Sequence, residues 1–175
     1  MTLTPRRRPW RSAGYARVRS RPSPPFVGAL LRLIVAVTVR TFEVIEHTAD
    51  VGILARGDTV EEAFAAAADG MLSFIIRPED VRPVETRRRT VEADDRGGLL
   101  IAWLNDLLLL LNGDAFVPRE CRVLECSETR LVADVDGEPV DPTRHRFRLD
   151  VKAATYHQLD VAENDGWQAR VIFDV

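Results

Sequence analysis

Apolar and polar residues alternate near both ends of the region from residue 41 to residue 175, and this pattern predicts strands. Residues 42–46 and 52–56 form a first pair of short strands. Residues 159–162 and 167–175 flank Asn164-Asp165-Gly166, which is a strong hairpin signal. In the last segment Trp167 and Val175 belong to an apolar face, and Asp174 belongs to the opposite face.

Two stretches show helical spacing. In the first, Asp58 with Glu61 three residues later predicts a capped start, and Arg77-Pro78 predicts the end. Its apolar positions fall on one face: Val60, Ala63, Phe64, Ala67, Met71, Phe74 and Ile75.

The second helix is expected to begin near Gly97 and to end at Asn112-Gly113. Residues 99–111 are apolar nearly all round and too few to span a bilayer, so the stretch predicts a buried core helix. Asn105 and Asp106 interrupt it, and each needs either solvent or a hydrogen-bonding partner.

The remaining segments predict further strands. Residues 86–93 form one, with arginines 87–89 at a solvated edge rather than at a phosphate site. Residues 121–126 and 130–135 form a hairpin, residues 136–139 a turn, and residues 146–153 another strand, with a helix as the alternative. The elements together predict an α+β fold with mixed sheets and two helices, in strand-helix-strand-strand modules.

Charge divides the chain near residue 40. Residues 1–40 hold nine arginines and no acidic residue, whereas residues 41–175 hold 15 basic and 27 acidic residues, a net charge of −12. A domain with this net negative charge is not expected to bind RNA strongly by neutralising its phosphates, but it suits a cation or a basic protein partner. Cys121 and Cys126 match neither a disulfide framework nor a metal motif, which predicts reduced thiols in a cytoplasmic protein.

Residues 1–40 are predicted to be a basic, disordered extension rather than part of the domain at 41–175. Three explanations stay open: a start site assigned too far upstream, a disordered arm, or a targeting segment. Residues 26–39 are too short and too interrupted by Arg32 to cross a membrane.

Candidate chemistry lies at the two ends of the domain. Asp50 follows the first apolar strand, in Glu46-His47-Thr48-Ala49-Asp50-Val51-Gly52, and Asp174 precedes the last residue, Val175. If the fold brings these ends together, three acidic groups converge, and such a cluster needs a cation or protons. Oxygen ligands of this kind favour calcium, magnesium or manganese over zinc. Three histidines scattered along the chain do not make a zinc site, and His145 is expected at the surface.

These landmarks together resemble the archease family over residues 41–175. The resemblance rests on residues 42–53, on the helix start at 58–64, on Trp103-Leu104-Asn105-Asp106-Leu107-Leu108, on residues 151–157 and on the closing residues 170–175. It implies an α+β fold and a non-enzymatic protein. The extension of residues 1–40 has no counterpart in the family pattern.

The family role implied is activation of the GTP-dependent RtcB-type RNA ligase in tRNA splicing or RNA repair. Archeases promote guanylylation of that ligase and its multiple turnover. They are expected to contact RNA only indirectly, through the ligase. Family members bind a divalent ion, seen as calcium, through the equivalents of Asp50, Asp174 and the terminal Val175, and the equivalent of Lys152 is linked to activity. His47 and His157 lie in matching motifs, where hydrogen bonding is favoured over metal ligation.

Two rival functions remain at this point. A metal-dependent hydrolase or nuclease would use Asp50 and Asp174, with His47 or His157 as the general base. The sequence has no H-E-x-x-H, nucleophile elbow or phosphate-cradling glycine loop to favour it. A general protein chaperone or modulator would act broadly and without a metal.

Overall fold

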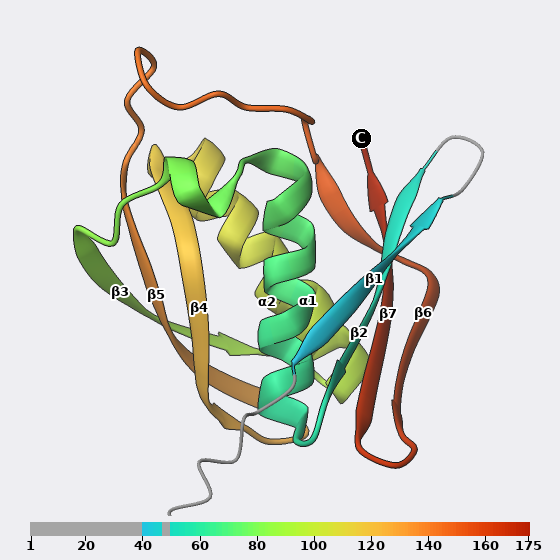
Figure 1. Cartoon of the computed structure of the whole chain (residues 1–175). Coiled ribbons are helices and arrows are strands. Elements are labelled where there is room, and N and C mark those ends of the chain that lie inside the picture. The colour runs from blue at the N-terminus through green and yellow to red at the C-terminus, as the bar shows by residue number, and fades with distance from the viewer. Residues whose placement is uncertain (1–39, 47–49) are drawn as a thin grey trace, which may run out of the picture. The chain divides into compact units, whose positions relative to one another are not determined.

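Within the residues that the structure describes, 40–46 and 50–175, seven strands and two α-helices form two sheets with the helices between them (Figure 1). This computed structural model places the described residues in one compact unit. Residues 1–39 and 47–49 lie outside the described residues, and so do the predictions for the basic extension and for His47. The α+β class with two helices is confirmed.

The first sheet has four strands in the order β1-β2-β7-β6. They are β1 (Thr41–Glu46), β2 (Val51–Gly57), β7 (Trp167–Asp174) and β6 (Ala153–Glu163). Both predicted strand pairs are therefore confirmed, and β6 begins earlier than expected. Asp165 and Gly166 have positive φ angles of 47° and 106° in the turn between β6 and β7, which is the conformation that an Asp-Gly pair favours.

The second sheet has three strands in the order β3-β5-β4. They are β3 (Glu85–Glu92), β5 (Arg130–Pro139) and β4 (Phe116–Cys126). The turn expected at residues 136–139 is wrong, because β5 continues through Gly137, which pairs with both neighbouring strands. Each strand pairing among the described residues is antiparallel, where mixed sheets were expected.

A long connection joins the two sheets between β5 and β6. The strand expected at residues 146–153 is wrong for most of its length, because residues 146–152 belong to no helix or strand. We call residues 140–152 the crossover segment. It passes over the ends of both helices (Figure 1), and the Arg148 N–H donates to the Ile75 carbonyl at 2.8 Å. Tertiary contacts, rather than a ladder, therefore hold its backbone.

Helix α1 (Val60–Ile75) begins one residue later than predicted. Thr59 is the N-cap, and its hydroxyl accepts a hydrogen bond from the Glu62 N–H. The Glu62 carboxylate in turn accepts from the Asp58 N–H at 2.8 Å. The capping pair is thus Thr59 and Glu62 in place of Asp58 and Glu61, because only this pair satisfies free N–H groups reciprocally. A short 3₁₀ turn, η1 (Pro78–Asp80), follows the helix.

Helix α2 (Arg96–Asn112) is apolar nearly all round because it packs against both sheets, as predicted for a core helix. Its two interrupting polar residues have partners. The Asn105 side chain exchanges hydrogen bonds with the main-chain N–H and carbonyl of Ala154, at 2.9 and 3.4 Å. Asp106 makes two hydrogen bonds to the Arg89 guanidinium. Neither described helix combines the length and apolar character that crossing a bilayer requires.

Both cysteines are free thiols, as predicted, and both pack against the core. Their odd spacing would place them on opposite faces of a regular strand. A register shift in β4 between Val123 and Glu125 adds one residue and reverses the alternation. Burial raises the pKa of the Cys121 thiol well above its ordinary value, so it stays protonated.

Candidate functional site

The antiparallel register of β2 and β7 brings the chain segments that carry the two predicted aspartates to one end of the first sheet. Val51 pairs with Phe173, and the next residues outward on the two segments are Asp50 and Asp174. Residues directly opposite in a regular antiparallel pair have Cβ atoms about 5 Å apart on the same face. The close approach of the two carboxylates is thus an extrapolation of the register by one residue, and it stays a prediction.

The neighbouring strand adds Lys152 on the other side of β7. Ala153 pairs with Asp174, and the Lys152 N–H donates to the Asp174 carbonyl at 2.8 Å. The Lys152 ammonium Nζ donates to the main-chain oxygen of Val175 at 2.9 Å. Asp174 and Lys152 are exposed, and Asp50 and Val175 are half-buried. Four of the six predicted site residues thus belong to one end of the β2-β7-β6 strands, near the chain end marked C in Figure 1, and their joint role stays a prediction.

Gly52 fixes how closely β2 and β7 approach beside this cluster. A Cβ at Gly52 would lie only 2.6 Å from Ile172 Cδ1 and 3.0 Å from the Val171 carbonyl oxygen. Ile172 therefore covers the glycine, and its side chain is 2% exposed although it lies on the outer face of the sheet. Gly52 thus leaves room for the Ile172 side chain to pack over the backbone two residues after Asp50.

The donor atoms of this cluster suit a hard cation. Asp50 and Asp174 offer carboxylate oxygens and Val175 a main-chain oxygen, with no nitrogen or sulfur ligand among them, and this chemistry fits calcium, magnesium or manganese. Across residues 40–46 and 50–175, no group of three or more His, Cys, Asp or Glu side chains gathers closely enough to hold a metal. Among the described residues, the donors proposed here are two side chains and the chain end, and a cation site stays a prediction.

The structure does not bring His157 to this cluster by strand pairing. The register of β6 shifts between Thr155, which pairs with Ile172, and Asp160, which pairs with Arg170. His157 lies in that irregular stretch, exposed, with its N–H donating to the Thr155 hydroxyl at 3.3 Å. Its ring Nε2 lies 3.2 Å from Gln158 Nε2. A role for His157 stays a prediction, as does one for His47.

His145 lies in the interior, so the expectation of a surface residue is wrong. It is 3% exposed, and its Nδ1 accepts a hydrogen bond from the Asp141 N–H at 3.0 Å. A neutral ring of this kind carries its proton on Nε2, which lies 3.2 Å from the Glu138 carboxylate. The Arg144 guanidinium and the Arg82 N–H also donate to this carboxylate.

The buried pair of Glu138 and His145, with its partners Arg82 and Arg144, was missed by sequence reasoning. Burial acts to raise the pKa of Glu138, but the hydrogen bonds from Arg144, Arg82 and His145 outweigh it and lower the pKa to about 2. No local signal marks these residues, because they look like any charged turn sequence. The group anchors the crossover segment to β5 rather than forming a reactive site.

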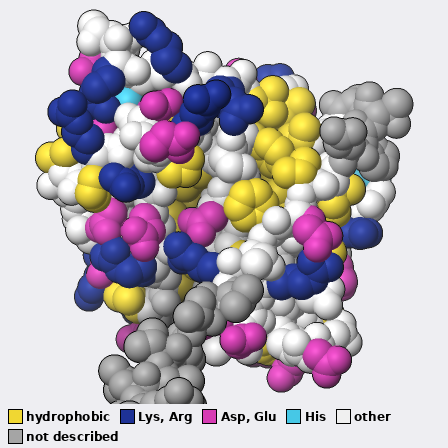
Figure 2. All heavy atoms as spheres, viewed as in Figure 1, with side chains coloured by type: hydrophobic (Ala, Val, Ile, Leu, Met, Phe, Trp, Pro, Cys, Tyr) yellow, Lys and Arg dark blue, Asp and Glu magenta, His cyan; other side chains and the backbone are white. Residues whose placement is uncertain are grey.

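The solvated edge predicted for arginines 87–89 is confirmed for the exposed Arg88. Arg87 and Arg89 are half-buried on the opposite face of β3, where Arg89 pairs with Asp106 of α2. Arg88 makes two hydrogen bonds to Asp134, at 2.9 and 3.0 Å, on the outer face of the second sheet. These bonds lower the pKa of Asp134. Basic and acidic side chains are interleaved over the face shown in Figure 2, so this side of the molecule offers no broad phosphate-binding surface.

Comparisons with known proteins bear on the same region of the chain. The sequence pattern of the Archease protein family (MTH1598/TM1083) matches residues 42–175. The chain is similar to "Protein archease" of Methanosarcina mazei, with 37% identity over 141 residues that cover 78% of this chain and 97% of that protein. It is similar to "Protein archease" of Thermococcus kodakarensis, with 36% identity over 142 residues that cover 78% of this chain and all of that protein.

A solved structure supports the same likeness. The solution structure of Methanobacterium thermoautotrophicum protein 1598 superposes with a TM-score of 0.64 and 32% sequence identity. The match covers 77% of this chain and 98% of that one. The two helices and two antiparallel sheets described above are therefore those of this structural neighbour.

Proposed function

Because the chain belongs to the archease family, we propose that it activates a GTP-dependent RtcB-type RNA ligase without catalysing a reaction itself. Family membership supports a cofactor role in tRNA splicing. The proposal goes further and gives the protein a single partner, the ligase, whose guanylylation and multiple turnover it promotes in tRNA splicing or RNA repair.

One observation supports the proposal: Val51 pairs with Phe173, so Asp50 and Asp174 belong to the same end of the β2–β7 pair, where Lys152 donates to the Val175 oxygen. The two carboxylates and the Val175 oxygen would hold a divalent cation. The ion, when bound, supplies a positive charge that stabilises phosphate charge developing during nucleotide transfer. Asp50 and Asp174 stay exposed enough to meet a partner surface, and Lys152 holds the Val175 oxygen in place by its hydrogen bond.

Ligation kinetics with the cognate ligase test this proposal. Single-turnover and multiple-turnover joining of RNA ends is measured with and without this protein, and then with Asp50→Ala or Asp174→Ala. Both variants should fold normally and lose the stimulation, because each removes one ligand. Full stimulation by either variant would refute the proposed cation site, and the Asp165→Asn variant at the β6–β7 turn is the matched control.

The same purified protein separates the rival functions. Incubation with RNA carrying phosphate or cyclic-phosphate ends, but without ligase, should leave the RNA unchanged. RNA cleavage or end processing that disappears in Asp50→Ala would instead identify a metal-dependent hydrolase or nuclease. Suppression of aggregation of unrelated proteins, unaffected by a chelator, would point to a general chaperone.

A further inference from the structure

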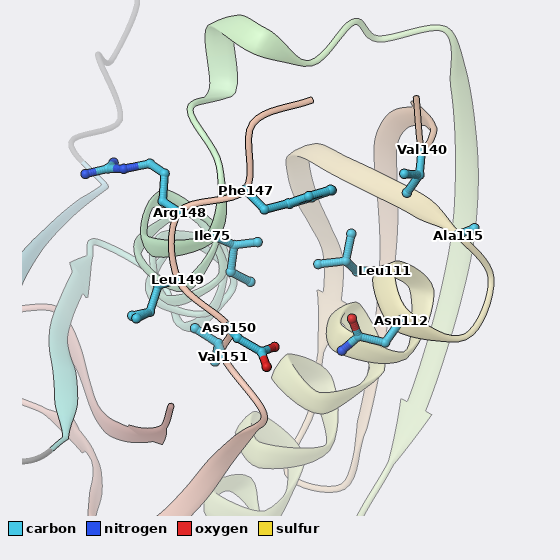
Figure 3. A pocket seen from close by; sticks show the side chains of 10 residues that line it. All are labelled: Ile75, Leu111, Asn112, Ala115, Val140, Phe147, Arg148, Leu149, Asp150 and Val151. Atoms are coloured by element: carbon cyan, nitrogen blue, oxygen red, sulfur yellow. The ribbon is translucent and has the colours of Figure 1, made fainter. Parts of the chain in front are cut away.

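A cavity of about 560 Å³ lies under the crossover segment, between the C-terminal ends of α1 and α2 (Figure 3). Ile75, Leu111, Val140 and Phe147 point into it from four different parts of the chain. Ligand pockets commonly combine apolar walls of this kind with a few polar groups that fix orientation. Neither Asp50 nor Asp174 lines this cavity, although the lining residues Asp150 and Val151 directly precede Lys152.

Phe147 gives the cavity a flat aromatic surface. Its side chain is 47% exposed, which is unusual for a large apolar residue at the mouth of a hollow. Its ring packs edge-to-face on the His145 ring, with centroids 6.3 Å apart. His145 is itself held by Asp141 and Glu138, so the phenyl ring is supported from behind. A ring fixed in this way can stack on a planar ligand.

The opposite side of the cavity is rich in hydrogen-bond acceptors. Asp150 and Asn112 face each other there (Figure 3), and neither makes a hydrogen bond or ion pair with another described residue. Leu111 and Asn112 end α2, whose last turn contains no basic residue. The end of a helix carries partial negative charge, so this side suits a ligand edge that donates N–H groups.

Basic side chains surround the outside of the cavity. Arg146 and Arg148 flank Phe147 and are exposed, and Arg148 points away from the hollow in Figure 3. Arg146 makes no ion pair or hydrogen bond with another residue in the described part of the chain. Arg146 directly precedes Phe147 in the chain, and an exposed, unpaired guanidinium next to the ring suits a phosphate outside the cavity.

We propose that this cavity binds a guanosine nucleotide, either free or at an exposed position of an RNA strand. The base stacks on Phe147, its N1–H and N2–H₂ groups donate to Asp150, and the Asn112 amide donates to an acceptor of the same base. The phosphate lies outside, within reach of Arg146. Adenine fits less well, because it presents an acceptor at N1 where guanine presents a donor.

A simple aliphatic amine is a weaker candidate for the cavity. It would pair with Asp150, but it would leave the Phe147 ring without a stacking partner and would bring a positive charge toward Arg146. The nucleotide uses all three features: a ring, a donor edge and an anion. This inference does not depend on the proposed ligase role, since binding is measured on this protein alone.

Calorimetric titration of the full chain with GMP and with AMP tests the proposal. GMP should bind at least about ten-fold more tightly than AMP, the discrimination expected of a paired donor-acceptor contact. Asp150→Asn should remove this preference, and the control Asp160→Asn, an exposed aspartate of β6, should keep it. Absence of GMP binding, or equal affinity for GMP and AMP in the unmodified protein, would overturn the proposal.

A second variant pair tests the stacking surface. Phe147→Ala should weaken both nucleotides about ten-fold, because a base loses its aromatic partner, and Phe147→Trp should restore binding. Circular dichroism and denaturation verify that both variants fold. Unchanged GMP affinity in a folded Phe147→Ala variant would overturn the proposal. Titration with a short RNA ending in guanosine identifies the source of the base: tighter binding than GMP assigns a strand end, and weaker binding assigns the free nucleotide.

Discussion

Carboxylates occupy two opposite environments in this molecule, both near strand ends. Glu138, near the end of β5, is 5% exposed and accepts hydrogen bonds from Arg82, Arg144 and His145. Asp50 directly precedes β2 and Asp174 ends β7, at the same end of that strand pair, and the Lys152 ammonium donates to the adjoining Val175 oxygen. A carboxylate whose oxygens accept several hydrogen bonds from the protein stabilises the fold. A carboxylate at a strand end without such donors keeps its capacity to bind a ligand.

Another acidic residue, Asp69, shows how burial changes the pKa of a carboxyl that has few hydrogen-bond donors around it. Asp69 on α1 is paired with Arg40 at 3.1 Å. Burial raises the pKa of Asp69 to about 6, although Arg40 opposes the change, and the nearby Glu120 adds to it. Glu138 is more fully enclosed, yet its pKa is about 2. The number of hydrogen-bond donors, rather than depth alone, decides whether a buried carboxylate stays charged.

Removing the buried carboxylate is the harshest test of this comparison. Glu138→Ala should lower the free energy of unfolding by about 3–5 kcal/mol, because the Arg82 N–H and the buried His145 ring lose their shared acceptor. Among the described residues, Arg144 would keep a single ion pair, with Asp141 at 3.7 Å. Denaturant unfolding followed by tryptophan fluorescence measures the change. Glu128→Ala is the control, since its carboxylate is 68% exposed and its pair with Arg96 should contribute about 1 kcal/mol or less. A loss of less than about 1 kcal/mol in the free energy of unfolding for Glu138→Ala would contradict a structural role for Glu138.

The strand-end pair should respond to cations instead. At a calcium concentration about 100-fold above the dissociation constant, the unmodified protein should gain about 2.7 kcal/mol of stability. Asp174→Asn should fold as well as the unmodified protein but lose this gain, because it removes a ligand without disturbing the core. Thermal unfolding with calcium or with a chelator measures both quantities. Equal calcium stabilisation of Asp174→Asn and Asp165→Asn would refute the distinction.

Asn105 connects the core to the strand beside Asp174. Asn105→Ala should cost about 1–3 kcal/mol, since it leaves the buried N–H of Ala154 without an acceptor. Ala153, the residue before Ala154, pairs with Asp174. The rate of amide hydrogen exchange at the start of β6 should therefore rise as well. Denaturant unfolding and amide exchange test this, with the exposed Asn164→Ala as the control. Unchanged exchange at Ala154 would argue against Asn105 as the anchor of β6.

The pH dependence of stability should distinguish Glu138 from Asp69, because the pKa values of the two carboxyls are shifted in opposite directions. The pKa of Glu138 is lowered from 4.5 to about 2, so its stabilisation is present above pH 4.5 and lost as the pH falls toward 2. The pKa of Asp69 is raised from 3.8 to about 6, so its contribution is full below pH 3.8 and lost as the pH rises through 6.

Denaturation midpoints across the pH range check these opposite signs. Glu138→Gln should flatten the profile on the acid side, and Asp69→Asn should flatten it between about pH 4 and 6.5. Asp160→Asn, an exposed aspartate of β6, should leave both parts of the profile unchanged. A profile for Asp69→Asn that parallels the unmodified protein would show that Asp69 is not perturbed by burial.

The local sequence pattern predicted some elements of the fold and missed others. Periodicity and capping signals located both helices to within about two residues and identified the terminal strand pairs, because side-chain alternation and helix caps are properties of neighbouring residues. They failed at residues 136–139 and 146–152, where pairing with two strands extends β5 and long-range hydrogen bonds support a chain without a ladder.

The candidate site divides in the same way. The sequence alone determined which residues carry acidic oxygens at the two ends of the domain, and it placed Asp174 on the outer face of its strand, since alternation in a strand is local. Only the tertiary structure decided that Asp50 and Asp174 belong to the same end of the β2–β7 pair, that His145 is buried on Glu138, and that Asp150 and Phe147 face one cavity. The register of distant strands and the packing of the crossover segment depend on the whole core, which no local pattern contains.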